Sequence, residues 1–170
     1  LSGENITRIK GVFSGSLSFI FNTFSEKDTS FSEILNKAIS NGFTEPDPRE
    51  DLSGNDVGRK LLILARELEL ENEFDDISIQ NLIPVSLRKG SVKEFITELE
   101  VLDDFFSKIK NNQEPDHVLR YVGDLYGDLL KENGNLEEKL VSVPKESALG
   151  QVKGSDSIIE IYTESYGEHP

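Results

Sequence analysis

Four carboxylates and a lysine stand out among the charged side chains between residues 45 and 60. They are Glu45, Asp47, Asp51, Asp56 and Lys60, and the segment that carries them also holds two prolines and two glycines. Proline fixes its own φ and favours extended backbone in the residue before it, so these carboxylates are predicted to have fixed directions. Asp56 and Lys60 are four residues apart, which places them on one face of a helix. Carboxylates beside a lysine suit a small zwitterionic substrate and a proton transfer.

The same residues also have simpler structural interpretations. Asp56 and Lys60 could form an exposed helical ion pair that contributes only about 0.3–0.5 kcal/mol. Asp47 is predicted to be a turn residue that hydrogen-bonds its own backbone. A calcium loop is excluded, because Arg49 occupies the second ligand position of the run from Asp47 to Asp51. The spacing of the charges alone leaves the catalytic and the structural interpretation open.

The order of these residues resembles the signature of homoserine dehydrogenases. The segment reads Gly42-Phe43-Thr44-Glu45-Pro46-Asp47-Pro48, then Asp51-Leu52-Ser53-Gly54, Asp56 and Lys60, with the family spacing kept. A second block, residues 11–22, is similar to the family's turn from a strand into a helix beside the nicotinamide. The helix over residues 61–67 is most similar to that of bifunctional aspartokinase–homoserine dehydrogenases. The resemblance is densest over residues 8–70 and continues more weakly to the C-terminus.

The resemblance implies an oxidoreductase that interconverts L-aspartate 4-semialdehyde and L-homoserine with NADP or NAD, in threonine and methionine biosynthesis. The residues it assigns are Lys60 and Asp51 as catalytic, Glu45, Asp56, Phe43 and Thr44 as substrate-binding, and Gly15 and Ser16 as cofactor-binding. Lys60 would be the general acid/base, since hydride addition to a carbonyl builds negative charge on its oxygen. Glu45 and Asp56 would accept hydrogen bonds from the substrate ammonium. The turn at residues 14–16 also has a structural interpretation, as a serine cap of the next helix.

Composition limits the classes of partner. The 170 residues include 32 acidic and 18 basic ones, a net charge of −14, which argues against nucleic-acid or anionic-membrane surfaces. The absence of cysteine excludes disulfides and thiolate metal sites, and two distant histidines, His117 and His169, argue against zinc, so no metal is predicted. No apolar run is long enough to span a membrane and the first residues do not resemble a signal peptide, so a cytoplasmic location is expected.

The periodicity of apolar residues predicts one α+β domain over residues 1–170, with a mixed β-sheet and helices packed on one face as two layers. Strands are predicted at 6–13, near 77–83, and at 118–125, 136–144 and 157–164. Helices are predicted at 17–24, from a capping box at Ser30 and Glu33 to a C-cap at Asn41 and Gly42, at 55–69, and at 91–110.

The chain contains no G-x-G-x-x-G after a strand, so no dinucleotide-binding fold is predicted within it. The resemblance implies that a Rossmann domain precedes this region and that a further segment follows it. The chain is therefore expected to be the substrate-binding and dimerisation domain of a larger enzyme, inactive alone, and to pair as a homodimer through its sheet. The alternative is a non-enzymatic dimerisation or regulatory module that keeps the signature, which the length of the parent gene would distinguish.

Overall fold

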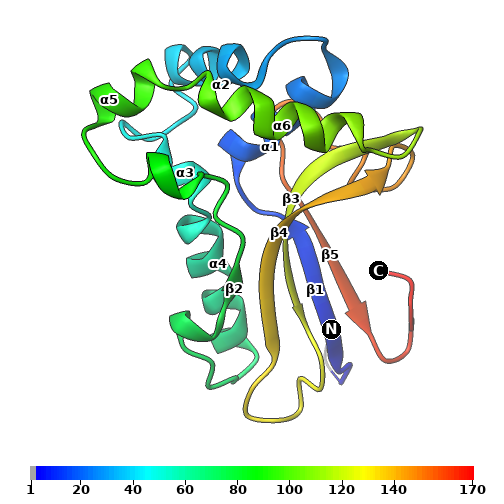
Figure 1. Ribbon diagram of the computed structural model, residues 1–170. Helices are drawn as coiled ribbons and strands as arrows, with labels where there is room; N and C mark the ends of the chain where they lie inside the picture. Colours follow the sequence, from blue (N-terminus) through cyan, green and yellow to red (C-terminus); the bar gives the residue numbers. More distant parts are fainter. Residues whose placement is uncertain (1–2) are drawn as a thin grey trace.

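A five-stranded mixed sheet forms the frame of the protein, which the computed structural model describes over residues 3–170 (Figure 1). The strands are β1 (Ile6–Val12), β2 (Ser78–Ile79), β3 (His117–Tyr126), β4 (Asn135–Pro144) and β5 (Ile158–Thr163), in the order β2-β4-β3-β1-β5. β2 runs parallel to β4, and the other pairs are antiparallel. The predicted α+β fold is confirmed. The strand expected near 77–83 is reduced to the two residues of β2.

Six α-helices are described beside the sheet. They are α1 (Gly15–Glu26), α2 (Phe31–Ser40), α3 (Arg49–Leu52), α4 (Asn55–Glu67), α5 (Val92–Thr97) and α6 (Val101–Asn111), with single 3₁₀ turns η1 (Phe74–Asp76) and η2 (Val85–Leu87). The capping box predicted at Ser30 and Glu33 is present, and Gly42 ends α2 with a positive φ of 71°. The short helix α3 lies between α2 and α4, where the sequence predicted no helix.

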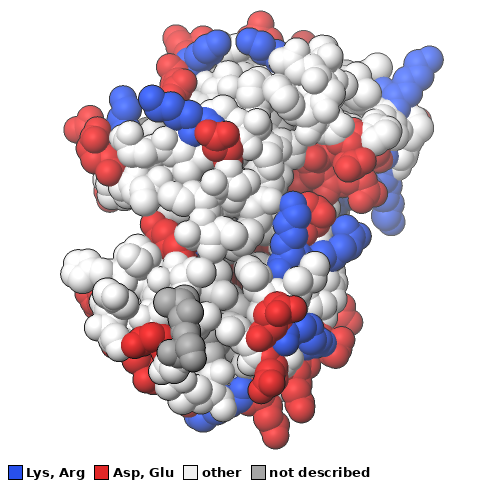
Figure 2. Space-filling view, turned by 180° about the vertical axis from the view of Figure 1, so that it is seen from behind, with Lys and Arg blue, Asp and Glu red and all other residues white. Residues whose placement is uncertain are grey.

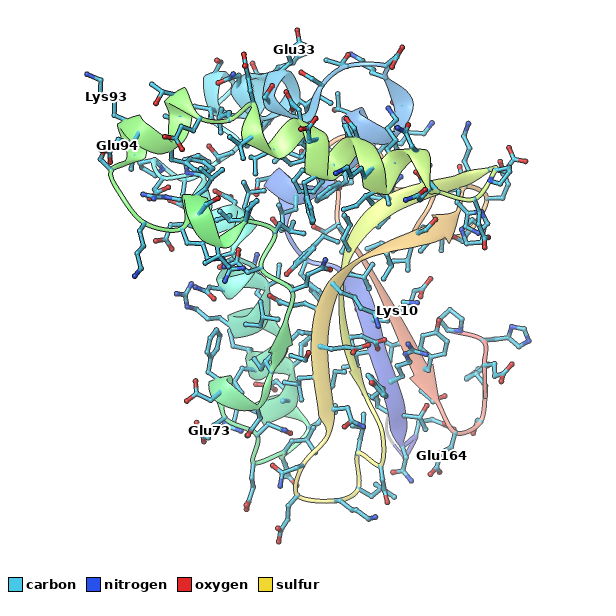
Figure 3. All side chains as sticks on the ribbon, viewed as in Figure 1. Lys10, Glu33, Glu73, Lys93, Glu94 and Glu164 are labelled. Carbon is cyan, nitrogen blue, oxygen red and sulfur yellow. The ribbon has the colours of Figure 1, made fainter. Side chains whose placement is uncertain are left out.

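The single helix predicted over residues 91–110 is wrong, because the chain turns at residues 98–100 and forms two helices. The turn is held by i→i+3 hydrogen bonds, from the N–H of Glu98 to Phe95 and from the N–H of Val101 to Glu98. It buries Leu99 while leaving Phe105 42% exposed, so the apolar residues do not all face inward. Lys93 and Glu94 at the start of α5 project away from the core (Figure 3).

The main core lies between the sheet and the helices. At its centre Phe31 of α2 stacks on Phe106 of α6 with ring centroids 3.7 Å apart, and Phe21 and Phe24 of α1 contact the same pair. All four rings are buried, so α1, α2 and α6 are tied together at one end of the sheet. This packing fixes the direction in which α1 leaves β1.

The other face of the sheet is polar at one end and apolar at the other. At the polar end Arg8 of β1 pairs with Asp124 of β3, and Lys139 of β4 lies 3.0 Å from Glu137. At the apolar end a small cluster of valines and Leu149 is buried. Figure 2 shows that acidic and basic side chains are interspersed over the visible surface. No helix among the described residues has the length and apolarity needed to cross a membrane.

A buried arginine holds the connection between β4 and β5 over that apolar end. Arg120 of β3 is 3% exposed, although it lies on the face away from the helices. Its guanidinium donates hydrogen bonds of 2.7 to 3.3 Å to the carbonyl oxygens of Leu119, Leu149, Gly150 and Val152. Burial lowers the pKa of this group, and the charge of Glu26 opposes that effect. The carbonyls compensate for the water that the guanidinium has lost.

Candidate functional site

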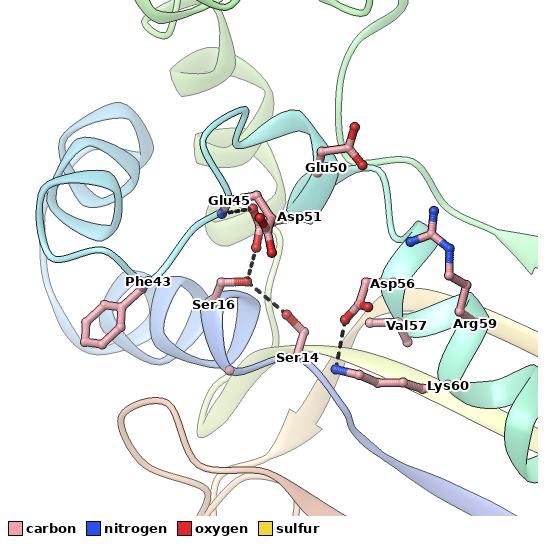
Figure 4. Close-up of a pocket in the computed structure, with 11 residues that line it drawn as sticks. Ser14, Ser16, Phe43, Glu45, Glu50, Asp51, Asp56, Val57, Arg59 and Lys60 are labelled. Carbon is pink, nitrogen blue, oxygen red and sulfur yellow. Dashed lines mark hydrogen bonds and ion pairs between the residues drawn. The ribbon is translucent and has the colours of Figure 1, made fainter.

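A pocket of about 470 Å³ lies where the end of β1, the loop after α2, α3 and the start of α4 meet (Figure 4). It is lined by Ser14, Gly15, Ser16, Phe43, Glu45, Glu50, Asp51, Asp56, Val57, Arg59 and Lys60. The residues come from these four parts of the fold, although most of them lie within one stretch of sequence. This is the largest concentration of predicted site residues in the described chain.

One side of the pocket is a network of hydrogen bonds around Asp51. Ser14 caps α1 by accepting from the N–H of Leu17, and its hydroxyl lies 3.0 Å from that of Ser16. The hydroxyl of Ser16 donates to Asp51 Oδ1 at 2.6 Å, and the N–H of Glu45 donates to Asp51 Oδ2 at 2.9 Å. Both carboxylate oxygens of Asp51 are therefore engaged by groups of the same chain. The capping interpretation of residues 14–16 is confirmed, and Ser16 and Gly15 also line the pocket.

The loop before α3 is fixed by an aspartate and an arginine. The N–H of Arg49 donates to Asp47 Oδ1 at 3.0 Å, which confirms that Asp47 is a turn residue. The Arg49 guanidinium pairs with the same carboxylate at 2.7 Å and lies over the ring of Phe95, 5.4 Å from its centroid. The Arg49 guanidinium lowers the pKa of Asp47 through these hydrogen bonds. This contact connects the pocket loop to α5.

The other side of the pocket is the first turn of α4. Gly54 precedes the helix with a left-handed φ of 84°, which favours glycine. Asp56 and Lys60 then lie on the same face, with Oδ2 and Nζ 2.8 Å apart and side chains 59% and 44% exposed. Lys60 Nζ also donates to the carbonyl oxygen of Phe13 at 2.9 Å. The ammonium of Lys60 is thus held at the pocket wall between a carboxylate and a backbone carbonyl.

The structure does not bring every predicted residue to the same point. Asp51 and Lys60 both line the pocket, but the contacts of Asp51 are with Ser16 and the backbone of Glu45. Phe43 is 41% exposed and packs on Phe19 of α1, with ring centroids 4.7 Å apart. Thr44 is not among the residues that line the pocket.

Sequence reasoning missed two charged residues at the pocket and two residues behind it. Glu50 and Arg59 line the pocket, and their positions beside Asp51 and Lys60 were the only signal for them. Behind Gly54, Tyr121 of β3 and Glu138 of β4 are buried against each other, with 3.2 Å between the phenol oxygen and Glu138 Oε1. No sequence pattern marked this pair.

Burial changes the acid–base properties of the pair behind the pocket. It raises the pKa of Glu138 to about 8, and the charge of Asp56 adds to this effect although the Tyr121 hydrogen bond opposes it. Burial also raises the pKa of Tyr121 well above its usual range. Within residues 3–170, no group of three or more histidine, aspartate or glutamate side chains could hold a metal ion.

Comparison with known proteins points to one family. The family model for homoserine dehydrogenase matches residues 1–169. A bifunctional aspartokinase/homoserine dehydrogenase of Daucus carota, named as chloroplastic, is 43% identical over 171 residues, which cover 99% of this chain and 18% of that protein. A homoserine dehydrogenase of Paracoccidioides brasiliensis is 42% identical over 181 residues, which cover 99% of this chain and 47% of that protein.

A solved structure has the same fold. The crystal structure of a Candida auris protein, described as being of unknown function, superposes with a TM-score of 0.84 at 35% identity, over 97% of this chain and 47% of that one. The chain therefore spans about half the length of the fungal relative and about a fifth of the bifunctional one.

Proposed function

The chain belongs to the homoserine dehydrogenase family, and from this premise we propose that it supplies the substrate-binding and proton-transfer residues for interconversion of L-aspartate 4-semialdehyde and L-homoserine. The observation that carries the proposal is the position of Lys60. Its ammonium stands at the wall of a polar pocket, beside Asp56 and within reach of a bound small molecule. A primary ammonium in such a place can both neutralise and protonate a developing alkoxide.

Lys60 is the general acid/base of the proposed reaction. A nicotinamide cofactor supplies the hydride when it is bound. As the aldehyde carbon is reduced, Lys60 donates a proton to the carbonyl oxygen, and in the reverse direction it accepts the proton of the alcohol. The carbonyl oxygen of Phe13 and the carboxylate of Asp56 accept hydrogen bonds from the Lys60 ammonium and so fix its direction.

The carboxylates have two proposed roles, which are to bind the substrate and to maintain the shape of the pocket. Glu45 and Asp56 line the pocket and are the proposed acceptors for the substrate ammonium. Asp51 has both oxygens engaged, so its proposed role is to position Ser16 and the backbone of Glu45 rather than to contact Lys60. Phe43 and Thr44 precede Glu45 in the same loop, and they are proposed to set the direction from which the substrate enters.

The family uses NAD or NADP, and the residues beside the turn after β1 fit its nicotinamide. Ser14, Gly15 and Ser16 line the pocket with hydroxyl and backbone groups and carry no charge. An uncharged surface of this kind suits the carboxamide and ring of a nicotinamide. The rest of the cofactor is proposed to bind a Rossmann domain outside these residues, and so the chain alone is expected to be inactive.

Two copies of this domain are proposed to pair through the polar end of the sheet. Basic side chains of β1 and β4 and acidic side chains of β3 and β4 alternate there, including Arg8, Lys10, Asp124, Glu137 and Lys139. A face that carries both signs can be complementary to a second copy of itself across a twofold axis. The expected cytoplasmic location stays a prediction, since the carrot relative is chloroplastic.

The test is homoserine oxidation by the complete protein that contains this domain. The reaction is measured as the reduction of NAD or of NADP. Replacing Lys60 by alanine should lower kcat by about 10²- to 10⁴-fold, the usual contribution of a general acid/base. Lys37→Ala, at an exposed helical lysine outside the pocket, is the control. Lack of activity in the wild-type protein with both cofactors would contradict the proposal.

A further inference from the structure

A buried carboxyl group lies directly behind the residue that precedes α4. Glu138 is 1% exposed and extends from β4 toward Gly54. A Cβ atom at Gly54 would lie 2.2 Å from Glu138 Oε1 and 2.3 Å from the phenol oxygen of Tyr121. Such distances are far inside van der Waals contact, so the two side chains fill the space against the Gly54 backbone. Asp56 and Lys60 follow on the helix that begins at this point.

The hydrogen bonds in this cluster favour one protonation state of Glu138. The phenol of Tyr121 has one proton, and its oxygen lies 2.9 Å from the carbonyl oxygen of Gln80 and 3.2 Å from Glu138 Oε1. If the phenol donates to Gln80, which can only accept, then Glu138 must provide the proton for the second contact. A protonated Glu138 satisfies both contacts, whereas an ionised one leaves one of the acceptors without a proton.

The second oxygen of Glu138 favours the same state. Oε2 is buried and has no hydrogen-bond partner. An unpartnered carbonyl-type oxygen of a neutral acid costs much less free energy than an unpartnered oxygen of a buried carboxylate. Both oxygens therefore favour a neutral carboxyl group in the folded protein.

We propose that Glu138 is a positioning residue: in its protonated form, together with Tyr121, it supports the Gly54 turn and thereby sets where Asp56 and Lys60 stand in the pocket. This inference rests on the function proposed above. When Glu138 loses its proton, a buried negative charge arises behind the first turn of α4, on the same side as Asp56. The turn must then loosen to admit water, and Asp56 and Lys60 lose their fixed positions.

The surroundings of Glu138 set the pH at which it loses its proton. Burial raises the pKa of the group to about 8, with a further contribution from the charge of Asp56. The titratable groups that face it are Tyr121 from β3 and Asp56 from α4, while β2 and the residue after it contribute Ile79 and the Gln80 carbonyl. The protonated form is therefore the main one at neutral pH, and it is lost in the mildly alkaline range.

The first experiment measures the proton on Glu138 directly and requires no activity. The side-chain carboxyl carbons of glutamate are labelled with ¹³C and their NMR shifts are followed against pH, with Glu138 assigned by the signal that Glu138→Gln removes. We expect one signal to titrate well above the others, near pH 8. If every glutamate signal of the wild type titrates in the ordinary glutamate range, the proposal is overturned, and this result needs only that the wild-type protein be folded.

The second experiment tests whether the proton fixes α4. The N–H of Gly58 donates to the Gly54 carbonyl at 3.0 Å, so its hydrogen-exchange protection factor reports on this turn. In the wild type, this protection should fall as pH rises through the titration of Glu138, and in Glu138→Gln it should stay constant. Glu137→Gln is the matched control, because Glu137 is the neighbouring carboxylate on the opposite face of β4, paired with Lys139. Equal pH dependence in wild type and Glu138→Gln would refute the positioning role.

The third experiment connects Glu138 to the reaction in the complete protein. Glutamine mimics the protonated acid, so Glu138→Gln should keep kcat/KM within about threefold of wild type at pH 7. Between pH 7 and pH 9 the wild type should lose up to about tenfold relative to the variant, as expected for one ionisation. Parallel pH profiles would overturn the link to catalysis. If the wild-type protein shows no homoserine oxidation at all, the proposed function fails, while the titration and exchange results still decide the role of Glu138.

Discussion

The two sides of the pocket carry similar residues but use them differently. On the α3 side, Asp51 accepts hydrogen bonds from Ser16 and from the backbone of Glu45, and neither oxygen is left free. On the α4 side, Asp56 and Lys60 contact mainly each other, and about half of each side chain is exposed. An aspartate's role in a pocket therefore follows from how many of its acceptor sites the fold already uses. The α3 side is the frame, and the α4 side presents charge to a ligand.

The difference has a second part behind the α4 side. The exposed Asp56–Lys60 pair is supported from below by a buried, uncharged pair, Tyr121 and Glu138. A surface ion pair alone is weakly held, since water screens it and both side chains are free to move. Tyr121 and Glu138 pack against Gly54, and this packing fixes the position of the first turn of α4, which the ion pair alone would not fix.

Gly54→Ala should disrupt the α4 side most. A methyl group there would overlap Glu138 and Tyr121, and the left-handed φ of 84° adds strain. We expect a loss of about 2–5 kcal/mol in the free energy of unfolding, measured by urea denaturation. Gly42→Ala is the matched control, because its φ is also positive at 71° but no atom lies within 4 Å of the added Cβ. Equal losses in the two variants would show that the space behind Gly54 is not rigid.

Glu138→Gln should change how stability depends on pH. The folded protein holds the Glu138 proton up to about pH 8, whereas an unperturbed glutamate releases it near 4.5. The folded state therefore binds more protons between these values, and wild-type stability falls as pH rises through this window. The variant lacks this contribution, so its stability relative to wild type should improve by at most about 1.4 kcal/mol per pH unit. Urea denaturation at several pH values measures it, and a constant difference would contradict the prediction.

Asp51→Ala should destabilise the α3 side of the pocket. It removes an acceptor from the buried hydroxyl of Ser16 and from the N–H of Glu45. A hydrogen bond to a charged group contributes about 1.5–3 kcal/mol to stability. We expect a loss of about 2 kcal/mol in thermal or chemical unfolding, which comes mainly from the Ser16 bond, because the N–H of Glu45 is exposed and can bind water instead. Asp51→Asn keeps one carbonyl acceptor and should lose less. A stability equal to wild type in the alanine variant would mean that Asp51 does not support the pocket.

Asp56→Ala should have the smallest effect on stability and a clear effect on substrate binding. Its ion pair with Lys60 is exposed, so we expect a change below about 0.5 kcal/mol in the free energy of unfolding. In the complete protein, KM for homoserine should rise by more than kcat falls, as for a lost binding contact. A large stability loss without a change in KM would mean that Asp56 supports the pocket and does not bind the substrate.

Local sequence predicted the α4 side well, because its determinants are close together in the chain. The capping box at Ser30 and Glu33, the glycine that ends α2 and the apolar stripe of α4 all act over a few residues. Glu45, Asp51, Asp56 and Lys60 line one pocket for the same reason, since a short rigid segment can turn through only a limited space.

The parts that sequence missed depend on contacts between distant residues. Glu138 stands in a run of two glutamates and a lysine, and only the pairing of β4 with β3 places it inward beside Tyr121. The break between α5 and α6 contains no proline or glycine, so the residues alone did not indicate it. Tertiary packing favours the turn there, because it buries Leu99 in the main core.

Arg120 holds the backbone of the connection between β4 and β5 in a way that does not depend on the side chains of that connection. Arg120 binds the carbonyl oxygens of residues 149, 150 and 152, which every amino acid possesses. Substitutions in this connection can therefore accumulate without loosening its attachment, whereas lysine at position 120 could not span the same oxygens. Gly150 is the exception, since a Cβ there would lie 2.2 Å from the carbonyl oxygen of Pro144. Across homologous sequences, we expect Arg120 and Gly150 to persist while the side chains around them diverge.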